Sequence, residues 1–191
     1  MGSPLGGALV KRTALLATAA STLALATVLG TQAAATAAPV SAAPAAAPAA
    51  EQAAAVTKLT HSQATTRLRN AGVSWTSSGG CSNRNQSNCT SFEQVNLATI
   101  QGAETLKSAS GCALTITGGT ETGHASGTYS HWNGYKLDYS LSTCVNNYVT
   151  GNFTYIGTRS DGAAQYRSGA GNIYAKEGNH WDVLYYNCGG C

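Results

Sequence analysis

The chain has 191 residues and carries 11 Lys and Arg against 8 Asp and Glu. From residue 38 onward the count is nine against eight, so most of the excess positive charge lies near the N-terminus. A nearly neutral chain without a concentrated basic face is not expected to bind nucleic acid.

Residues 1–37 have the features of a secretion signal peptide. A basic pair at residues 11–12 precedes an apolar run over residues 13–29, and Ala35 and Ala37 suit a signal peptidase. The run is too short and too rich in Ala and Thr for a permanent span, which needs about 20 strongly apolar residues. We therefore expect export, with no membrane association once the signal is removed.

Residues 38–57 consist mainly of Ala and Pro and contain almost no large apolar side chain. Such a segment cannot bury enough surface to offset its ordering entropy, so we expect a linker or a pro-segment. Residues 58–191 are long enough for one domain with a hydrophobic core.

All six cysteines lie in residues 58–191. An even number in an exported chain indicates three disulfides. Many pairings are possible, and the one that closes local loops joins Cys81 with Cys89, Cys112 with Cys144, and Cys188 with Cys191. The alternative for the C-terminal C-G-G-C is a zinc knuckle, which export and the lack of a second nearby C-x-x-C disfavour.

A first, short helix is expected over residues 62–71. Ser62 is a suitable N-cap, and Gly72 follows the last helical residue. Residues 76–90 have the composition of a loop, which the Cys81–Cys89 bridge would close.

The clearest helix is expected over residues 92–109. Ser91 and Gln94 have capping-box spacing, and Gly111 lies just past the end. The apolar stripe that would pack on the sheet consists of Phe92, Val95, Ile100, Ala103 and Leu106.

The sheet is predicted to begin at residues 112–117, where Leu114 and Ile116 share one face. A loop rich in Gly, Ser and Thr follows over residues 118–134.

Further strands are predicted at residues 135–141, 148–157 and 180–187. In the first of these, the apolar residues alternate with polar ones, so Asp138 points away from the apolar face. One long helix with several strands joined by loops predicts an α+β fold, in which a single domain has a mainly antiparallel sheet.

Two groups of ligand-capable residues stand out in the second half. The stretch "SHWNGYKLD" contains His131 and Asp138, and "EGNHWD" contains Glu177, His180 and Asp182. A catalytic zinc ion needs three nitrogen or oxygen ligands and an open position, which two histidines and one carboxylate supply. Glu177 would then be free to transfer protons, and Asp182 could orient a ligand imidazole.

The two groups together resemble the zinc D-Ala-D-Ala peptidases, a family within the set that includes lysostaphin-type enzymes and the hedgehog signalling domain. That family is marked by S-x-H-x-x-G-x-x-x-D and, later, E-x-x-H. The preceding helix and the "LTITGG" strand also occur in the family order, so the resemblance covers about residues 91–182. The matching positions are His131, Gly134 and Asp138, then Glu177 and His180, while Ser130 directly precedes His131, one position closer than in the family pattern.

The resemblance implies one Zn²⁺ bound by His131, Asp138 and His180, with Glu177 as general base and acid. It also implies hydrolysis of a peptide bond in peptidoglycan stem peptides, of the D-Ala-D-Ala carboxypeptidase or endopeptidase type. We therefore expect a secreted, monomeric metallopeptidase whose partners are peptidoglycan peptides.

The loop after the "LTITGG" strand departs from the family pattern. Many relatives carry an arginine there, in a sequence like S-G-Y-R, whereas this chain has "TGGTETGH" with Glu121. Arg159 is a candidate substitute, because its planar guanidinium could hold a substrate carboxylate. The cleaved bond stays open for this reason.

Several residues allow both a role in the cleft and an ordinary structural one. Trp132 and Trp181 flank the two proposed histidine ligands, and packing is favoured over a role as cleft walls. Asp161 and Glu121 are expected to be turn and loop residues. The candidates for supporting the metal ligands or contacting substrate are Ser130, Asp182, Arg159, Trp181 and His124.

A competing interpretation is a secreted binding or inhibitor protein that keeps the fold and the metal site without hydrolysis. The two interpretations differ in what Glu177 does, because only hydrolysis needs its carboxylate. The sequence also leaves open whether the target is the producer's own wall or a foreign one, and whether residues 38–57 are inhibitory.

Overall fold

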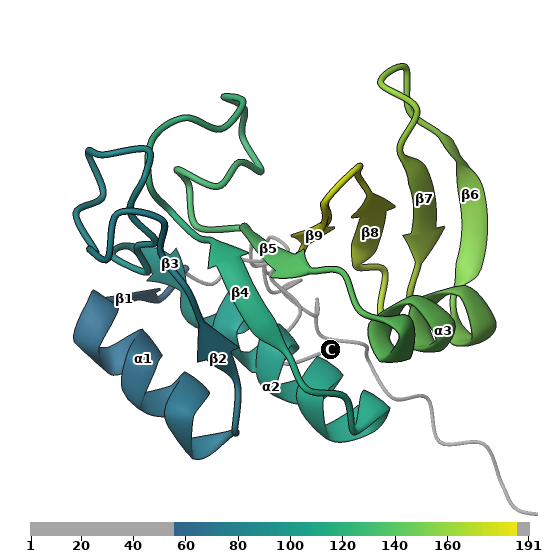
Figure 1. The fold of residues 1–191 in the computed structure, drawn as a ribbon, viewed down its shortest axis with the longest axis horizontal. Coiled ribbons are helices and arrows are strands. Elements are labelled where there is room, and N and C mark those ends of the chain that lie inside the picture. Colours follow the sequence, from purple (N-terminus) through teal and green to yellow (C-terminus); the bar gives the residue numbers. More distant parts are fainter. Residues whose placement is uncertain (1–55, 187–191) are drawn as a thin grey trace, which may run out of the picture. The chain divides into compact units, whose positions relative to one another are not determined.

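The computed structural model describes residues 56–186 (Figure 1). The predicted signal peptide, nearly all of residues 38–57 and the Cys188–Cys191 pair lie outside this part of the chain. Within residues 56–186 the chain forms three helices and nine strands in one compact body. The α+β prediction is confirmed.

The main sheet is mixed but mostly antiparallel. Only the pairing of β2 with β4 is parallel among its described strands. A separate short ribbon pairs β1 (Lys58–Leu59) with β3 (Val95–Asn96). The order in the main sheet is β2 (Ser74–Trp75), β4 (Thr115–Gly118), β5 (Lys136–Ser140), β9 (His180–Leu184), β8 (Ile173–Lys176), β7 (Ala164–Arg167) and β6 (Thr154–Thr158).

The first helix, α1 (His61–Asn70), confirms the prediction for this segment but begins one residue early. Its N-cap is Thr60, not Ser62 as expected. The Thr60 side chain accepts a hydrogen bond from the backbone of Gln63, and the Gln63 side chain accepts one from the backbone of Thr60. This reciprocal capping box satisfies two donors at the helix start, which a cap at Ser62 would not do.

The long helix, α2 (Leu97–Ser110), begins five residues later than expected. Gln94 has a φ of 64° and β3 follows it, so the predicted box between Ser91 and Gln94 does not form. The end was predicted correctly, because Gly111 adopts the left-handed conformation with a φ of 65°.

The third helix, α3 (Thr143–Asn152), occupies part of a segment that was predicted as a strand. Ser142 caps it by accepting a hydrogen bond from the Val145 backbone at 3.1 Å. Val145 and Val149, one turn apart, bury one face of the helix. The β-branched residues of this segment therefore serve helix packing, and the strand starts only at β6.

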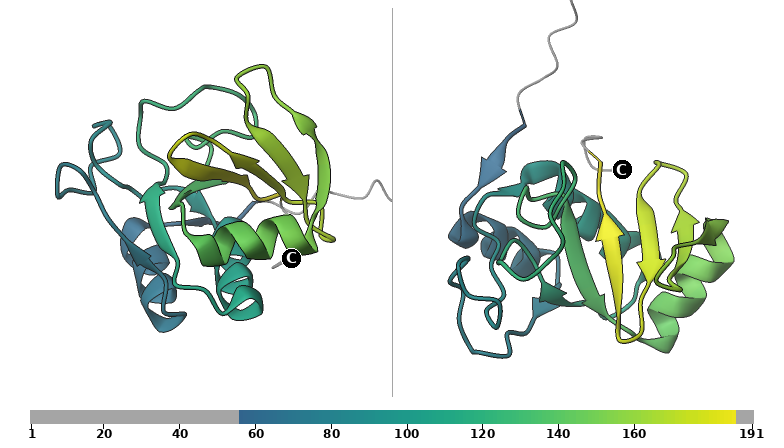
Figure 2. Two further views of the ribbon diagram at one scale, coloured as in Figure 1. Left: turned by 45° about the vertical axis from the view of Figure 1, so that its right-hand side comes forward. Right: turned by 90° about the horizontal axis from the view of Figure 1, so that it is seen from above.

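The core lies on one face of the central strands. Leu137 and Tyr139 of β5 and Trp181 and Val183 of β9 point into it and are fully buried, as the alternation predicted. Figures 1 and 2 show the helices gathered at one side of the sheet. The approach of α2 is close, because a side-chain carbon on Gly102 would overlap the Tyr185 ring.

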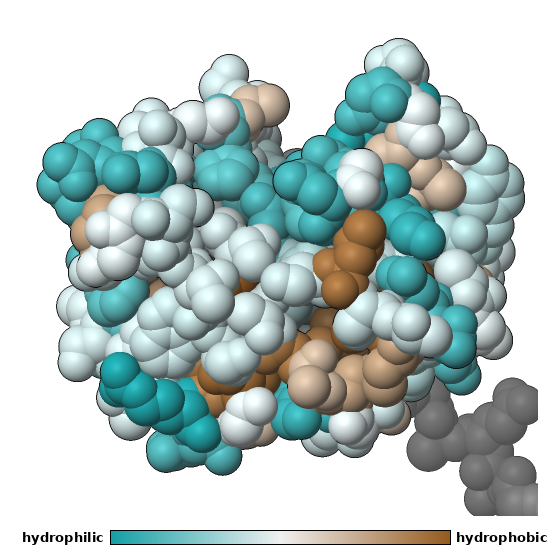
Figure 3. Space-filling view, viewed as in Figure 1, coloured by the Kyte–Doolittle hydropathy of each residue, from teal (hydrophilic) through white to brown (hydrophobic). Residues whose placement is uncertain are grey.

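The other face of β5 and β9 carries polar residues. The register places Asp138 directly opposite Asp182, and Ser140 opposite His180. Two segments rise on either side of these strands (Figure 1): the histidine loop, residues 119–135, and the β6–β7 turn, residues 159–163. Figure 3 shows a hollow between two raised parts of a surface that is mostly hydrophilic or near neutral.

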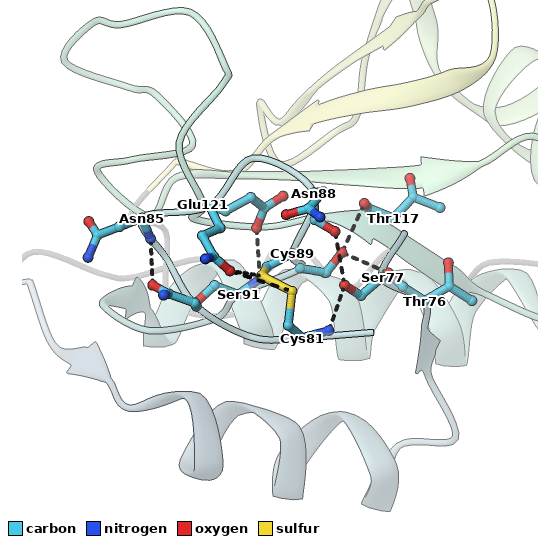
Figure 4. The surroundings of a disulfide bond; sticks show 12 residues. Thr76, Ser77, Cys81, Asn85, Asn88, Cys89, Ser91, Thr117 and Glu121 are labelled. Carbon is cyan, nitrogen blue, oxygen red and sulfur yellow. Dashed lines mark hydrogen bonds between the residues drawn. A yellow bond between two sulfur atoms is a disulfide. The ribbon is translucent and has the colours of Figure 1, made fainter. Parts of the chain in front are cut away.

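Two disulfides link segments of the described chain. Cys81–Cys89 closes the disulfide loop, residues 76–90, and Cys112–Cys144 joins the region after α2 to the start of α3. Both pairings were predicted from the sequence and are confirmed. Figure 4 shows Glu121 reaching from the histidine loop to Ser91, next to the first disulfide. None of the helices in residues 56–186 has the length and hydrophobicity to span a bilayer.

Candidate metal centre

A cleft of about 590 Å³ lies over the polar face of β5 and β9, between the histidine loop and the β6–β7 turn. Charged and ligand-capable side chains dominate its lining. They are three histidines, His124, His131 and His180; four carboxylates, Asp138, Asp161, Glu177 and Asp182; and two cations, Lys136 and Arg159.

The buried imidazole of His131 has one nitrogen fixed and one directed at carboxylates. Its Nδ1 donates a hydrogen bond to the Gly119 carbonyl at 2.7 Å. Its Nε2 lies 3.3 Å from Asp138 Oδ1 and 3.5 Å from Asp182 Oδ1. The proton on Nδ1 leaves the lone pair of the neutral ring on Nε2, which is the arrangement that a metal ligand requires.

Ser130 and Gly134 shape the turn that brings His131 to Asp138. The Ser130 hydroxyl accepts a hydrogen bond from the Asn133 backbone at 3.2 Å, and its carbonyl accepts one from Tyr135 at 3.1 Å. Gly134 has a φ of 78°, which supplies the change of direction expected from a glycine there. Ser130 therefore holds the turn and does not line the main cleft.

His180 repeats the arrangement from the opposite strand. Its Nδ1 donates a hydrogen bond to the Asn179 side-chain oxygen at 2.7 Å. Its Nε2 lies 3.5 Å from Asp138 Oδ1 and 3.3 Å from Glu177 Oε2. The short turn between β8 and β9 places Glu177 and His180 side by side, since the Glu177 backbone donates to the His180 carbonyl at 2.9 Å.

Asp138 and Asp182 each keep one oxygen without a hydrogen bond. Both side chains are buried, and the Oδ1 atoms have no hydrogen-bonding partner among the described residues. Buried carboxylate oxygens are normally paired, and two carboxylates directly opposite on neighbouring strands repel each other. The pair therefore requires positive charge at this point of the cleft.

The pKa of His131 reflects the negative charge of these two carboxylates. Burial lowers the pKa of its imidazole, but the neighbouring carboxylates of Asp138 and Asp182 outweigh this effect and raise the pKa to about 9. A proton on His131 supplies positive charge in the metal-free protein. A metal ion bound at this imidazole would have to displace that proton.

His124 is the third imidazole in the cleft. Its ring stacks on that of His131 with 3.8 Å between centroids, and its Nδ1 lies 3.7 Å from Asp138 Oδ2. One ligand atom from each of His124, His131 and Asp138 falls within 4.8 Å of the others, so this group could hold a metal ion.

Glu121 orients His124 and was missed in the sequence as a site residue. Its side chain is 2% exposed and accepts hydrogen bonds from the Ser91 backbone at 2.7 Å and the Gly119 backbone at 3.0 Å. His124 Nε2 lies 3.2 Å from its Oε1. Burial alone would raise the pKa of Glu121, but the hydrogen bonds from His124, Ser91 and Gly119 lower it below its usual value.

Arg159 reaches into the cleft from the β6–β7 turn. Its guanidinium donates to Asp161, to Glu177 Oε1 and, at 3.1 Å, to Asp182 Oδ2. These carboxylates raise the pKa of Arg159 further above its already high value, the Asp161 bond being the largest cause. Lys136 binds the same Asp182 oxygen at 2.7 Å. Lys136 lies on the same face of β5 as Asp138, so the alternation of this strand could have identified Lys136 as a cleft residue.

The two tryptophans have different positions. Trp181 is fully buried on the core face and donates a hydrogen bond to Asn146 at 2.9 Å, so the structure excludes it as a cleft wall. Trp132 is partly exposed and packs against the Arg84 guanidinium, 3.7 Å from the ring centroid. It lies outside the main cleft.

The structure thus brings together in one cleft the residues proposed from the sequence as ligands and as proton carrier. They are His131, Asp138, His180 and Glu177, accompanied by His124, Asp182 and Arg159. Comparisons with models of known protein families, with curated proteins and with solved structures gave no match.

Proposed function

We propose that this chain is a secreted zinc peptidase similar to the zinc D-Ala-D-Ala peptidases, acting on peptide bonds of peptidoglycan stem peptides. One Zn²⁺ would be held by His131, Asp138 and His180. The observation that carries the proposal is the approach of both Nε2 atoms to Asp138 Oδ1, at 3.3 Å and 3.5 Å. The resemblance in sequence supplies the substrate class.

The distance from Asp138 to each of the two imidazoles fits zinc. Nitrogen and oxygen ligands lie about 2.0–2.1 Å from Zn²⁺, so neighbouring ligands of a tetrahedral site are about 3.3 Å apart. The carboxylate oxygen between the two imidazoles has no hydrogen-bonding partner in residues 56–186. Each imidazole already gives its other nitrogen to an oxygen acceptor, which fixes the ring orientation.

The charge of the cleft also fits a divalent cation. With neutral imidazoles, its four carboxylates and two cationic side chains leave two negative charges in excess. Burial strengthens their mutual repulsion, because the effective dielectric constant is lower than in water. A bound Zn²⁺ would balance this excess.

Glu177 would act as the proton carrier. Zinc at such a site supplies a Lewis acid that polarises a peptide carbonyl and acidifies water. Glu177 Oε1 is held by Arg159, which leaves Oε2 facing the cleft beside His180. From there Glu177 would take a proton from the attacking water and return it to the leaving amine.

Export supports a substrate outside the cell. The two disulfides in the described residues suit an oxidising compartment. A secreted peptidase that acts on the cell wall would meet its substrate there. The chain would act as a monomer without nucleic acid or a membrane as partner.

The decisive experiment compares the wild type with Glu177→Gln. Zinc content is measured after purification without chelator, and peptides released from purified peptidoglycan are identified by mass spectrometry. We expect one zinc per chain in both proteins and a loss of turnover of about 10²- to 10⁴-fold in the variant. The masses of the released peptides identify the cleaved bond.

Glu104→Gln is the matched control. Glu104 lies outside the cleft, where its carboxylate forms an ion pair with Arg67 at 2.7 Å. This variant should keep both zinc and turnover. Zinc binding without any release of peptides would favour the binding or inhibitor protein, and the absence of bound zinc would refute the proposal.

A further inference from the structure

We propose that Arg159 is a positioning residue for Glu177, the proposed proton carrier, and that it does not hold a substrate carboxylate. The inference rests on the proposed function, because it concerns the residue that would transfer the proton there. The sequence alone suggested a different role, in which Arg159 replaces a substrate-binding arginine. The positioning role gives the β6–β7 turn a part in the reaction.

The guanidinium of Arg159 already binds carboxylates of this chain along both edges where a substrate carboxylate could bind with two hydrogen bonds. Along one edge, Nε and Nη2 donate to the two oxygens of Asp161, and the Nε bond is 3.2 Å long. Along the other edge, Nη2 donates to Glu177 Oε1 and Nη1 donates to Asp182 Oδ2 at 3.1 Å. A bidentate hold on a further carboxylate needs one of these edges. Arg159 is therefore committed to the carboxylates of the protein itself.

The β6–β7 turn fixes the Asp161 side of this arrangement. Backbone hydrogen bonds of 2.9 Å run from Arg159 to the Ala163 carbonyl and from Gly162 to the Arg159 carbonyl. The Asp161 Oδ1 atom also accepts a hydrogen bond from the Ala163 backbone at 3.1 Å. Such a bond to the backbone two residues further on is typical of aspartate in turns. Asp161, predicted only as a turn residue, thus also holds the guanidinium.

The central sheet fixes the Asp182 side. Asp182 is buried on β9, and its Oδ2 atom also accepts a hydrogen bond from Lys136 of β5 at 2.7 Å. Asp182 lies directly opposite Asp138, one of the proposed metal ligands. Because Arg159 is tied to the same two strands that would carry the ion, it can hold the Glu177 carboxylate in a defined place relative to Asp138.

Glu177 needs this support because its side chain is long and only partly buried. Its backbone is fixed in the turn before β9, where it donates to the His180 carbonyl at 2.9 Å. A glutamate nevertheless has several rotamers, and most of them would turn the carboxylate elsewhere. Proton transfer needs the carboxylate within hydrogen-bonding reach of the water, and a small misplacement costs much of the rate. The bond from Arg159 to Oε1 selects one rotamer and leaves Oε2 beside His180.

The experiment measures kcat and KM with soluble stem peptides prepared from purified peptidoglycan, together with zinc content. The variants of the full chain are Arg159→Lys, Glu177→Gln, the double variant of these two, and Arg167→Lys. Lysine keeps the positive charge but cannot reproduce the planar fork that joins three carboxylates. Arg167 is exposed at the end of β7 and serves as the matched control.

We expect Arg159→Lys to lower kcat by about 10- to 100-fold and to change KM by less than about 2-fold, with one zinc per chain retained. A residue that held the substrate carboxylate would show the opposite pattern, a raised KM with kcat nearly unchanged. In the Glu177→Gln background, Arg159→Lys should lower kcat little further, because the group that it positions is gone. Arg167→Lys should behave like the wild type.

Urea unfolding with chelator present gives a readout that needs neither metal nor activity. Arg159→Lys should lower the midpoint of unfolding more in the wild type than in the Glu177→Gln variant, since part of its effect is the lost bond to Glu177. Circular dichroism checks that each variant folds.

An unchanged kcat in Arg159→Lys, with or without a raised KM, would overturn the inference. Equal losses of kcat with and without the Glu177 carboxylate, or a loss of zinc from Arg159→Lys, would overturn it as well. In these cases the proposed function stands if Glu177→Gln keeps zinc and loses turnover. A wild type without zinc or turnover would overturn the proposed function, and the unfolding comparison would still show whether Arg159 fixes Glu177.

Discussion

Gly118 and Gly119 have no room for a side chain beside the cleft. A side-chain carbon on Gly118 would overlap Asp138 Oδ2, and one on Gly119 would overlap the Ser91 carbonyl. The first contact controls the position of a proposed metal ligand. The second brings the histidine loop close enough to Ser91 for Glu121 to accept its backbone hydrogen bond.

Gly118→Ala should therefore displace the Asp138 carboxylate. We expect zinc affinity to fall by about 10-fold or more and the free energy of unfolding to fall by roughly 1–3 kcal/mol, as for other overpacked sites. Gly151→Ala is the control, since that position has open space around it. Zinc titration and urea unfolding measure both effects, and an unchanged zinc affinity would contradict the role of Gly118.

Glu121 should make stability depend on pH at the acidic end. Its pKa is lowered in the folded protein, so its contribution is present above the ordinary value of 4.5 and is lost as the pH falls below it. We expect Glu121→Gln to unfold more easily than the wild type at neutral pH, by roughly 1–3 kcal/mol. The difference should shrink toward pH 3.

Urea unfolding from pH 7 to pH 3 tests this, with chelator present so that metal release does not contribute. The comparison with the variant isolates Glu121 from the other carboxylates of the cleft. A difference that stays constant over this range would show that Glu121 is not ionised in the folded protein.

Among the elements, the disulfide loop supports the histidine loop from outside the cleft. Arg84 donates from its side chain to the carbonyls of Thr120 and Trp132, and the Thr122 backbone donates to the Arg84 carbonyl at 2.8 Å. The loop is closed by Cys81–Cys89. This bridge therefore acts on the position of His124 and His131 as well as on stability.

The two disulfides should have different effects when each is replaced by a pair of alanines. In the chain-entropy model, Cys112–Cys144, with its separation of 32 residues, stabilises by roughly 3.7 kcal/mol, and Cys81–Cys89, with 8, by roughly 2.5 kcal/mol. We expect removal of Cys81–Cys89 to weaken zinc binding more. Urea unfolding should show the larger loss of stability in the variant without Cys112–Cys144. Zinc titration should show the larger loss of affinity in the variant without Cys81–Cys89.

The elements predicted correctly from the sequence are those that local patterns determine. Alternation identified β4, β5 and β9, and Gly111 marked the end of α2. The start of α2 depends on the pairing of β1 with β3, and α3 is stabilised by the burial of Val145 and Val149 in the hydrophobic core. No local pattern contains these contacts.

In the candidate site, too, the sequence identified some residues and missed others that depend on contacts distant in the chain. The ligand-capable types and their order identified His131, Asp138, Glu177 and His180. The role of Glu121 depends on backbone donors far away in the chain, so its residue type alone predicted a loop residue. The pairing of Asp138 with Asp182 depends on the register of β5 with β9, which the sequence does not specify.

At the scale of the whole molecule, the ion would be part of the fold. Asp138 and Asp182 face each other on two central strands of the sheet, between the helix-covered core and the cleft. Without a metal ion, their repulsion is offset by His131, Lys136 and Arg159. Removal of a bound ion would therefore affect the middle of the sheet.

Chelation should lower the thermal stability of the full chain. Zinc at 100 times its dissociation constant would add about 2.7 kcal/mol, which raises the midpoint of unfolding by roughly 10 °C for a domain of this size. His180→Ala should abolish this shift. Differential scanning calorimetry with zinc and with chelator measures it, and an equal midpoint in the two conditions would contradict a tightly bound ion.

The close contacts of the histidine loop also provide a diagnostic for distant relatives. Gly118, Gly119, Glu121 and His124 form the spacing G-G-x-E-x-x-H, and each position is tied to a contact that another residue type would break. A chain with this spacing before S-H-x-x-G-x-x-x-D and E-x-x-H-x-D should form the same cleft. Its remaining sequence could diverge freely, because the core needs only apolar side chains of suitable volume.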